Sequence, residues 1–213
     1  MITAAAVCPH PPLLLRELTG QHDAAAELRA ACRTAVDRVL HGAEHVALIG
    51  GAPAVPGTTR PDLAGGLPWS LRVGLRLLDD AQWTGPVELH PVADTTPTEE
   101  CLRRGQDLAA SSRPTALLVL GDGSARRSPK APGHFDERAH PFDAGLVTAL
   151  RSGDAQQLAA LDADLARDLL AEGRAAWQVL AGAAAAQHTP PRVEVHYADD
   201  PYGVMYVVAE WRW

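Results

Sequence analysis

The apolar run Ala116–Leu120 (ALLVL) ends directly at the polar turn Gly-Asp-Gly-Ser, and this junction constrains the fold more than any other feature of the chain. A run that is apolar at every position is typical of a strand buried on both faces of a sheet. Ile2–Val7 and His45–Ile49 are similar short apolar runs, bounded by proline and by glycine respectively. The chain therefore needs elements that cover both faces of such strands.

Stretches with helical spacing of apolar residues separate these strands. Asp23–Leu40 and Ser70–Asp80 have this periodicity, and Thr98–Ala110 opens with Thr-Glu-Glu-Cys, a helix-start signal with acidic residues in the first turn. Further helices are expected near 142–151 and 161–181. The alternation predicts one α/β domain over residues 1–213, with a central mixed, largely parallel sheet flanked by helices on both faces.

The C-terminal tail predicts a different kind of strand pairing. β-Branched and aromatic residues on both sides of Asp199-Asp200-Pro201-Tyr202-Gly203 indicate two strands joined by a tight connection. We expect this pair to be antiparallel. Val87–Val92 reads as another strand, and Ala52–Gly66, with three prolines and three glycines, reads as a loop.

Composition excludes several classes of partner. The chain has 19 Lys and Arg against 26 Asp and Glu, a net charge of −7, whereas nucleic-acid binding needs a basic surface. It carries no basic segment before its first apolar run and no uncharged run near the roughly 20 residues that span a bilayer. Its three cysteines are widely spaced, which suits a reducing compartment. We expect a cytoplasmic protein that binds neither nucleic acid nor membranes.

Polar side chains follow several of the predicted strands. Ligands of open α/β sheets bind beyond the carboxyl ends of the strands, which here are Cys8-Pro9-His10, Gly50-Gly51, His90-Pro91 and Gly121–Ser124. His10 stands between prolines, which restrict the backbone on both sides. It is either a rigid ligand at a strand tip or a solvent-facing loop histidine.

Three stretches resemble a known family: VCPHPPLLLRE at 7–17, VLGDGSARRSPKAPGHFDERAHPFD at 119–143 and PYGVMYVVA at 201–209. They resemble the LigB-like (B-subunit-like) class III extradiol ring-cleavage dioxygenases, a superfamily that includes the Memo-like proteins. The stretches occur in the family's order and extend over almost the whole chain.

The resemblance implies a mononuclear non-haem Fe(II) site with two histidines and a carboxylate, and a nearby histidine base that acts on a catechol-like aromatic substrate. His10 matches the first metal histidine. Asp199 or Asp200, close to the final Pro-Tyr-Gly, stands near the position of the family's acidic ligand. The resemblance therefore predicts His10 and either Asp199 or Asp200 as metal ligands.

Two positions depart from the family pattern. The loop after the second strand contains no histidine, and Ala125 stands where active members have the histidine of a Ser-His pair. We expect His134, His140 and Asp122 to be the candidate catalytic residues in their place, while His90 and His196 are further candidate ligands. The candidate substrate-binding residues are Ser124, Arg126 and Tyr202.

Two functions therefore stand open. The first is a divergent Fe(II) ring-cleavage oxidoreductase. The second is a non-catalytic relative that has lost the metal, needs no cofactor and acts as a binding or partner subunit. The sequence leaves open whether the chain forms a homo-oligomer or pairs with a different subunit.

Overall fold

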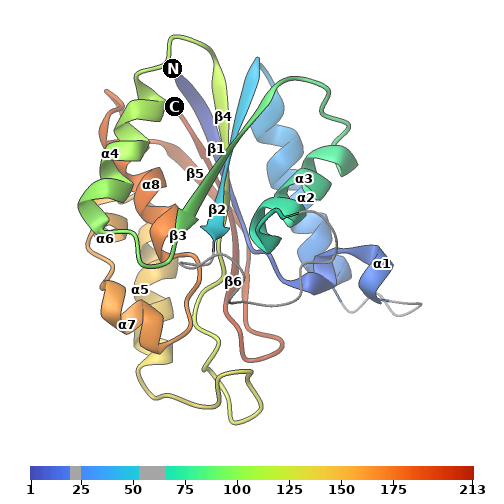
Figure 1. The fold of residues 1–213 in the computed structure, drawn as a ribbon, viewed down its shortest axis with the longest axis vertical. Coiled ribbons are helices and arrows are strands. Elements are labelled where there is room, and N and C mark those ends of the chain that lie inside the picture. The colour runs from blue at the N-terminus through green and yellow to red at the C-terminus, as the bar shows by residue number, and fades with distance from the viewer. Residues whose placement is uncertain (20–24, 53–65) are drawn as a thin grey trace.

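A computed structural model describes residues 1–19, 25–52 and 66–213 of the chain. Within these residues a single six-stranded sheet has the order β3-β2-β4-β1-β6-β5 (Figure 1). Four neighbouring strands are parallel, β6 pairs antiparallel with β1, and β5 pairs antiparallel with β6. The mixed, largely parallel sheet is therefore confirmed. The strands are β1 Ile2–Cys8, β2 His45–Ala52, β3 Val87–Ala93, β4 Thr115–Leu120, β5 Arg192–Asp199 and β6 Tyr206–Arg212.

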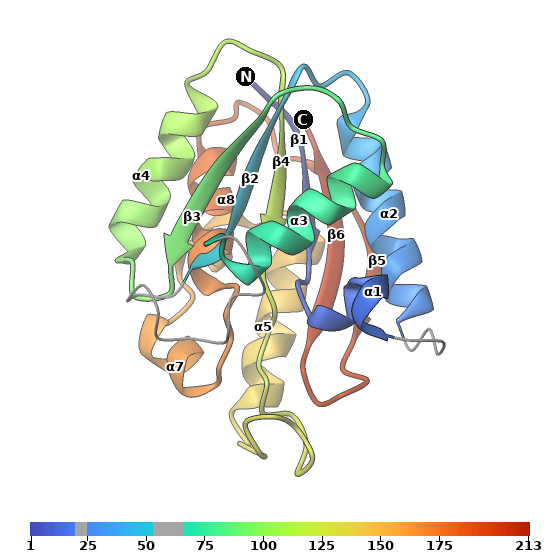
Figure 2. The ribbon, with the colours of Figure 1, turned by 45° about the vertical axis from the view of Figure 1, so that its right-hand side comes forward.

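Helices cover both faces of the sheet, as predicted. Figures 1 and 2 show α2 and α3 on one face and α4, α5, α7 and α8 on the other. The helices are the 3-10 turn η1 Pro12–Leu14 and the α-helices α1 Arg16–Thr19, α2 Ala26–Leu40, α3 Trp69–Asp80, α4 Thr98–Ala109, α5 Ala139–Ser152, α6 Ala155–Ala159, α7 Ala163–Asp168 and α8 Arg174–Ala185.

Two cores lie on opposite faces of the sheet, and alternate residues of β1 and β4 enter each of them. This alternation explains why residues 4–8 of β1 and 116–120 of β4 are apolar at every position. The core beneath α4, α5 and α8 contains Ala5, Val7, Leu117 and Val119, and the core beneath α2 and α3 contains Ala4, Ala6, Leu118 and Leu120.

The prediction of one helix over 161–181 is wrong, because the chain breaks between α7 and α8. Asp162 caps α7 by accepting hydrogen bonds from the backbone N–H groups of the helix's first turn. Leu170 then adopts a left-handed conformation with φ 55°. A Cβ on Gly173 would lie 2.2 Å from the Trp177 ring, so only glycine fits before α8. The break brings residues 169–173 to the carboxyl end of β4.

α4 begins at Thr98, as predicted; Pro97 is its N-cap residue, and no side-chain capping bond forms there. The predicted loop Ala52–Gly66 begins with the last residue of β2, while 53–65 lie outside the described residues. The antiparallel pair at the C-terminus is confirmed as β5 and β6.

Candidate active site at the carboxyl end of the sheet

His10 lies just beyond β1, at the edge of the sheet where the parallel strands end. Its backbone N–H donates to Asp122 Oδ1 over 2.7 Å, and its carbonyl accepts from Trp69 Nε1 over 3.1 Å. The adjoining strand ends are joined because the Gly121 N–H donates to the Cys8 carbonyl. His10 is only 4% exposed. It is therefore a fixed, buried side chain and not a solvent-facing loop residue.

Carboxylates lie at both nitrogens of the His10 ring. Nδ1 is 3.5 Å from Asp122 Oδ1, and Nε2 is 3.2 Å from Glu172 Oε2. The Asp122 side chain is largely buried, whereas that of Glu172 is 63% exposed. Two ligand atoms that each lie about 2.0–2.2 Å from the same metal ion are roughly 3 Å from one another. The distance between His10 Nε2 and Glu172 Oε2 therefore matches that between neighbouring metal ligands.

The position of Asp122 matches the usual support for a metal-binding histidine. Such a histidine commonly donates its other ring N–H to a carboxylate, which fixes the tautomer and the orientation of the ring. Asp122 faces the Nδ1 side while its own main-chain carbonyl accepts from the Gly173 N–H over 3.0 Å. One residue therefore holds both His10 and the segment that carries Glu172.

Glu172 is the site residue that the sequence interpretation missed. It lies in the break between α7 and α8, which was expected to be continuous helix. A Cβ on Gly51, near the end of β2, would lie 3.2 Å from the Glu172 carbonyl oxygen, so β2 also borders this segment. The available signal was Glu172-Gly173 directly before Arg174, since glycine is disfavoured inside a helix.

Ser124 stabilises the turn and is not available to a ligand. It is fully buried; its N–H donates to Asp143 Oδ1 and its hydroxyl donates to the Leu169 carbonyl. The Ser124 hydroxyl also accepts from the N–H of Arg126. Arg127 pairs with Asp143 at 3.0 Å, yet burial raises the pKa of this aspartate to about 6.

Asp199 and Asp200, at the β5–β6 connection, bind other groups and not His10. Asp200 pairs with Arg127, and Asp199 accepts the Asp200 N–H over 2.8 Å. Asp199 and Tyr202 also line a hollow of about 360 Å³ beside the start of α2. Neither aspartate is hydrogen-bonded or ion-paired to His10 across the described ranges. The structure thus brings Glu172, and not the predicted aspartates, into contact with His10.

His134 and His140 are both exposed. His134 lies in the segment between β4 and α5, and His140 lies in the first turn of α5. His134 has a left-handed φ of 60°, and the His140 ring lies 6.3 Å from that of Phe135. In the part of the chain that the structure describes, neither histidine is hydrogen-bonded or ion-paired to His10. Of the three predicted catalytic residues, only Asp122 contacts it.

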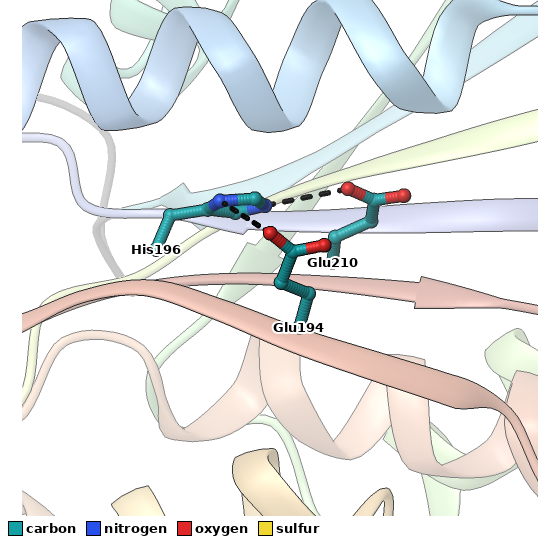
Figure 3. A group of neighbouring side chains, drawn as sticks. All are labelled: Glu194, His196 and Glu210. Carbon is teal, nitrogen blue, oxygen red and sulfur yellow. Dashed lines mark hydrogen bonds and ion pairs between the residues drawn. The ribbon is translucent and has the colours of Figure 1, made fainter.

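A second group of metal-ligating side chains is formed by Glu194, His196 and Glu210 (Figure 3). Their donor atoms lie within 4.8 Å of one another, and this is the single such group of three among residues 1–19, 25–52 and 66–213. Arg38 binds Glu194 at 2.7 Å and Glu210 at 3.1 Å, and Arg212 also pairs with Glu210. The group could hold a metal ion, but arginines already neutralise both carboxylates. It is a structural ion-pair cluster in this conformation.

Comparison with known proteins supports the fold only. No protein-family model and no curated protein matches the chain. A solved structure, an uncharacterized protein JW3007 from Escherichia coli K12, is similar over 99% of this chain and 100% of its own, with a TM-score of 0.52 and 15% identity. In the described part of the chain, no helix has the length and apolar character needed to cross a membrane.

Proposed function

We propose that this protein is a divergent relative of the LigB-like extradiol dioxygenases in which His10 and Glu172 bind a divalent metal, with Fe(II) as the native ion. The observation that carries the proposal is the buried His10 ring with Glu172 at Nε2 and Asp122 at Nδ1. A histidine nitrogen and a carboxylate oxygen are both ligands of the non-haem iron oxygenases.

The residues fit this metal in part. His10 and Glu172 would supply one nitrogen and one carboxylate ligand, and the bound metal would orient an oxygen-donor substrate such as a catecholate. The Asp122 carboxylate, with Oδ1 3.5 Å from Nδ1, would favour the tautomer that has its proton on Nδ1 and leaves Nε2 for the metal. The Glu172 side chain is 63% exposed, so the carboxylate beside Nε2 faces solvent while the His10 ring itself is buried.

The alternative is a non-catalytic relative that uses the same edge of the sheet as a binding site. Ala125 favours it, because a methyl group stands where the resemblance places the proton-accepting histidine. The backbone N–H of Ala125 donates to Leu169, so the residue is part of the turn. Loss of a positioned general base typically reduces the rate about 10²–10⁴-fold.

Oxygen consumption separates the two functions. The protein is loaded with Fe(II) without oxygen, desalted and mixed with a series of catechols in aerated buffer. The proposal predicts substrate-dependent oxygen uptake that is lost in His10→Ala and retained in His134→Ala, the matched exposed histidine. No retained iron, together with no oxygen uptake in the presence of any catechol, would favour the non-catalytic alternative.

A further inference from the structure

A cleft of about 430 Å³ lies at the end of the sheet opposite to His10. His45 and Thr115, the first residues of β2 and β4, line it, whereas His10 follows the last residue of β1, which is parallel to β4. Its volume is within the range of small-molecule pockets. The lining residues come from β2, β3, β4, α4 and the segment after α4: His45, Ala47, Glu88, His90, Arg104, Asp107, Leu108, Ser111, Arg113 and Thr115.

α4, which borders this cleft, packs closely on α8. A Cβ on Gly105 would lie 2.0 Å from the Val179 carbonyl oxygen, and one on Gly182 would lie 2.0 Å from that of Leu102. The two helices therefore touch through their backbones, and Figures 1 and 2 show them side by side on one face. The cleft lies between α4 and the first halves of β2 and β3. The buried Ala47 lines it on the sheet side, together with polar side chains of β2, β3 and β4.

Two of the charged side chains in the cleft are neutralised within α4. Arg104 binds Glu100 at 2.8 Å, and Asp107 binds Arg103 at 2.8 Å. The side chains of His45 and Arg113 make no hydrogen bond or ion pair within the three described ranges. His45 and Arg113 are thus basic groups at the cleft without an acidic partner among the described residues, and Glu88 is the remaining acid that lines it.

His90 adds an imidazole nitrogen that needs a partner. Its Nε2 is 3.4 Å from Glu88 Oε1 but forms no hydrogen bond within the described residues, although it is covered from solvent. Covered polar atoms of this kind commonly bind water or a ligand. Burial lowers the pKa of His90, so the ring is neutral at neutral pH and offers one N–H donor.

We propose that this cleft binds a small metabolite through an oxyanion, a carboxylate or a phosphate, held by Arg113 and His45, with His90 as a further hydrogen-bond donor. Charge-assisted hydrogen bonds from arginine to such groups are about twice as strong as neutral ones. The proposal is independent of the proposed metal site, because it involves other residues at the other end of the sheet.

The histidine side-chain NMR signals test the proposal. The protein is titrated at pH 6 with inorganic phosphate in one series and with citrate in another, and the signals are assigned with His45→Gln and His90→Gln. Saturable shifts of both histidines are expected with at least one anion, and the active probe identifies the chemical class. Arg113→Gln should weaken binding about tenfold or more, whereas Arg151→Gln, an exposed arginine on α5, should not.

Two results would overturn it: shifts that rise linearly with both anions, or equal binding by Arg113→Gln and the parent. Arg113 is exposed, so its replacement should leave the fold intact. Iron loading of Arg113→Gln should also be unchanged, so failure here is distinguishable from failure of the metal site.

Discussion

Glu172 Oε2 lies 3.2 Å from His10 Nε2, although 162 residues separate the two in the chain. His10 extends the end of β1, and Glu172 stands in the break that precedes α8. The break is necessary for this contact, because it turns the chain toward the carboxyl end of β4. The acid at His10 Nε2 therefore comes from the segment between α7 and α8 and not from the β5–β6 connection.

Asp122→Asn should weaken Fe(II) binding by about 10–100-fold, the usual effect of losing the carboxylate behind a metal-binding histidine. The amide oxygen can still accept the His10 N–H, so the fold should be kept. Isothermal titration with Fe(II) under nitrogen measures the change. Asp107→Asn, on the exposed face of α4, is the control, and equal affinity of both variants would contradict the assigned role of Asp122.

Asp143 should make the protein less stable as the pH rises from about 4 to about 6. Burial raises its pKa to about 6, above the ordinary 3.8, so the folded state holds the proton more tightly than the unfolded state does. This contribution is complete below pH 4 and is lost as pH rises through 6, at roughly 3 kcal/mol for two pKa units. Urea unfolding across this range should show a stability difference between the parent and Asp143→Asn that falls with pH. A pH-independent difference would contradict it.

Two glycine substitutions should have opposite effects on stability. Gly105→Ala places its Cβ against the α8 backbone and should cost about 3 kcal/mol or more. Gly145→Ala, in α5, meets no atom within 4 Å and should stabilise by about 0.5–1 kcal/mol. Urea unfolding measures both changes. A stable Gly105→Ala protein would mean that α4 and α8 do not pack as closely as described.

Arg38→Met should lower the free energy of unfolding by about 1–3 kcal/mol, because it removes one ionic partner from the buried Glu210. Glu210 keeps Arg212 and His196, which limits the loss. Arg33→Met, an exposed arginine of the same helix, is the matched control. Equal stability of the two variants would show that the arginine does not support the Glu194–His196–Glu210 group.

Local patterns in the sequence were sufficient for most of the fold. Apolar runs such as Ala116–Leu120 identified the buried strands, and the 3.6-residue period identified α2, α3 and α4. Both patterns depend on neighbours in sequence and are therefore visible without the structure. The expected helix over 161–181 failed because the bend at Leu170 depends on packing against distant residues, including the bond from the Gly173 N–H to the Asp122 carbonyl.

The sequence predicted only those residues of the candidate site that directly follow a strand. His10 and Asp122 both end neighbouring parallel strands, so their proximity follows from the topology. Glu172 could not be assigned in this way, because its position depends on the break before α8. Ser124 has the polar side chain expected of a ligand-binding residue. However, it is buried, and its hydroxyl donates a hydrogen bond to the Leu169 carbonyl.

Iron content after anaerobic loading with Fe(II) and desalting tests the central claim most directly, with parent, Glu172→Gln and Asp199→Asn compared side by side. Circular dichroism and unfolding temperature establish that all three are folded. The account predicts about one iron per chain in the parent and in Asp199→Asn, and almost none in Glu172→Gln. Iron retained by Glu172→Gln but lost from Asp199→Asn, or no iron in the parent, would contradict it.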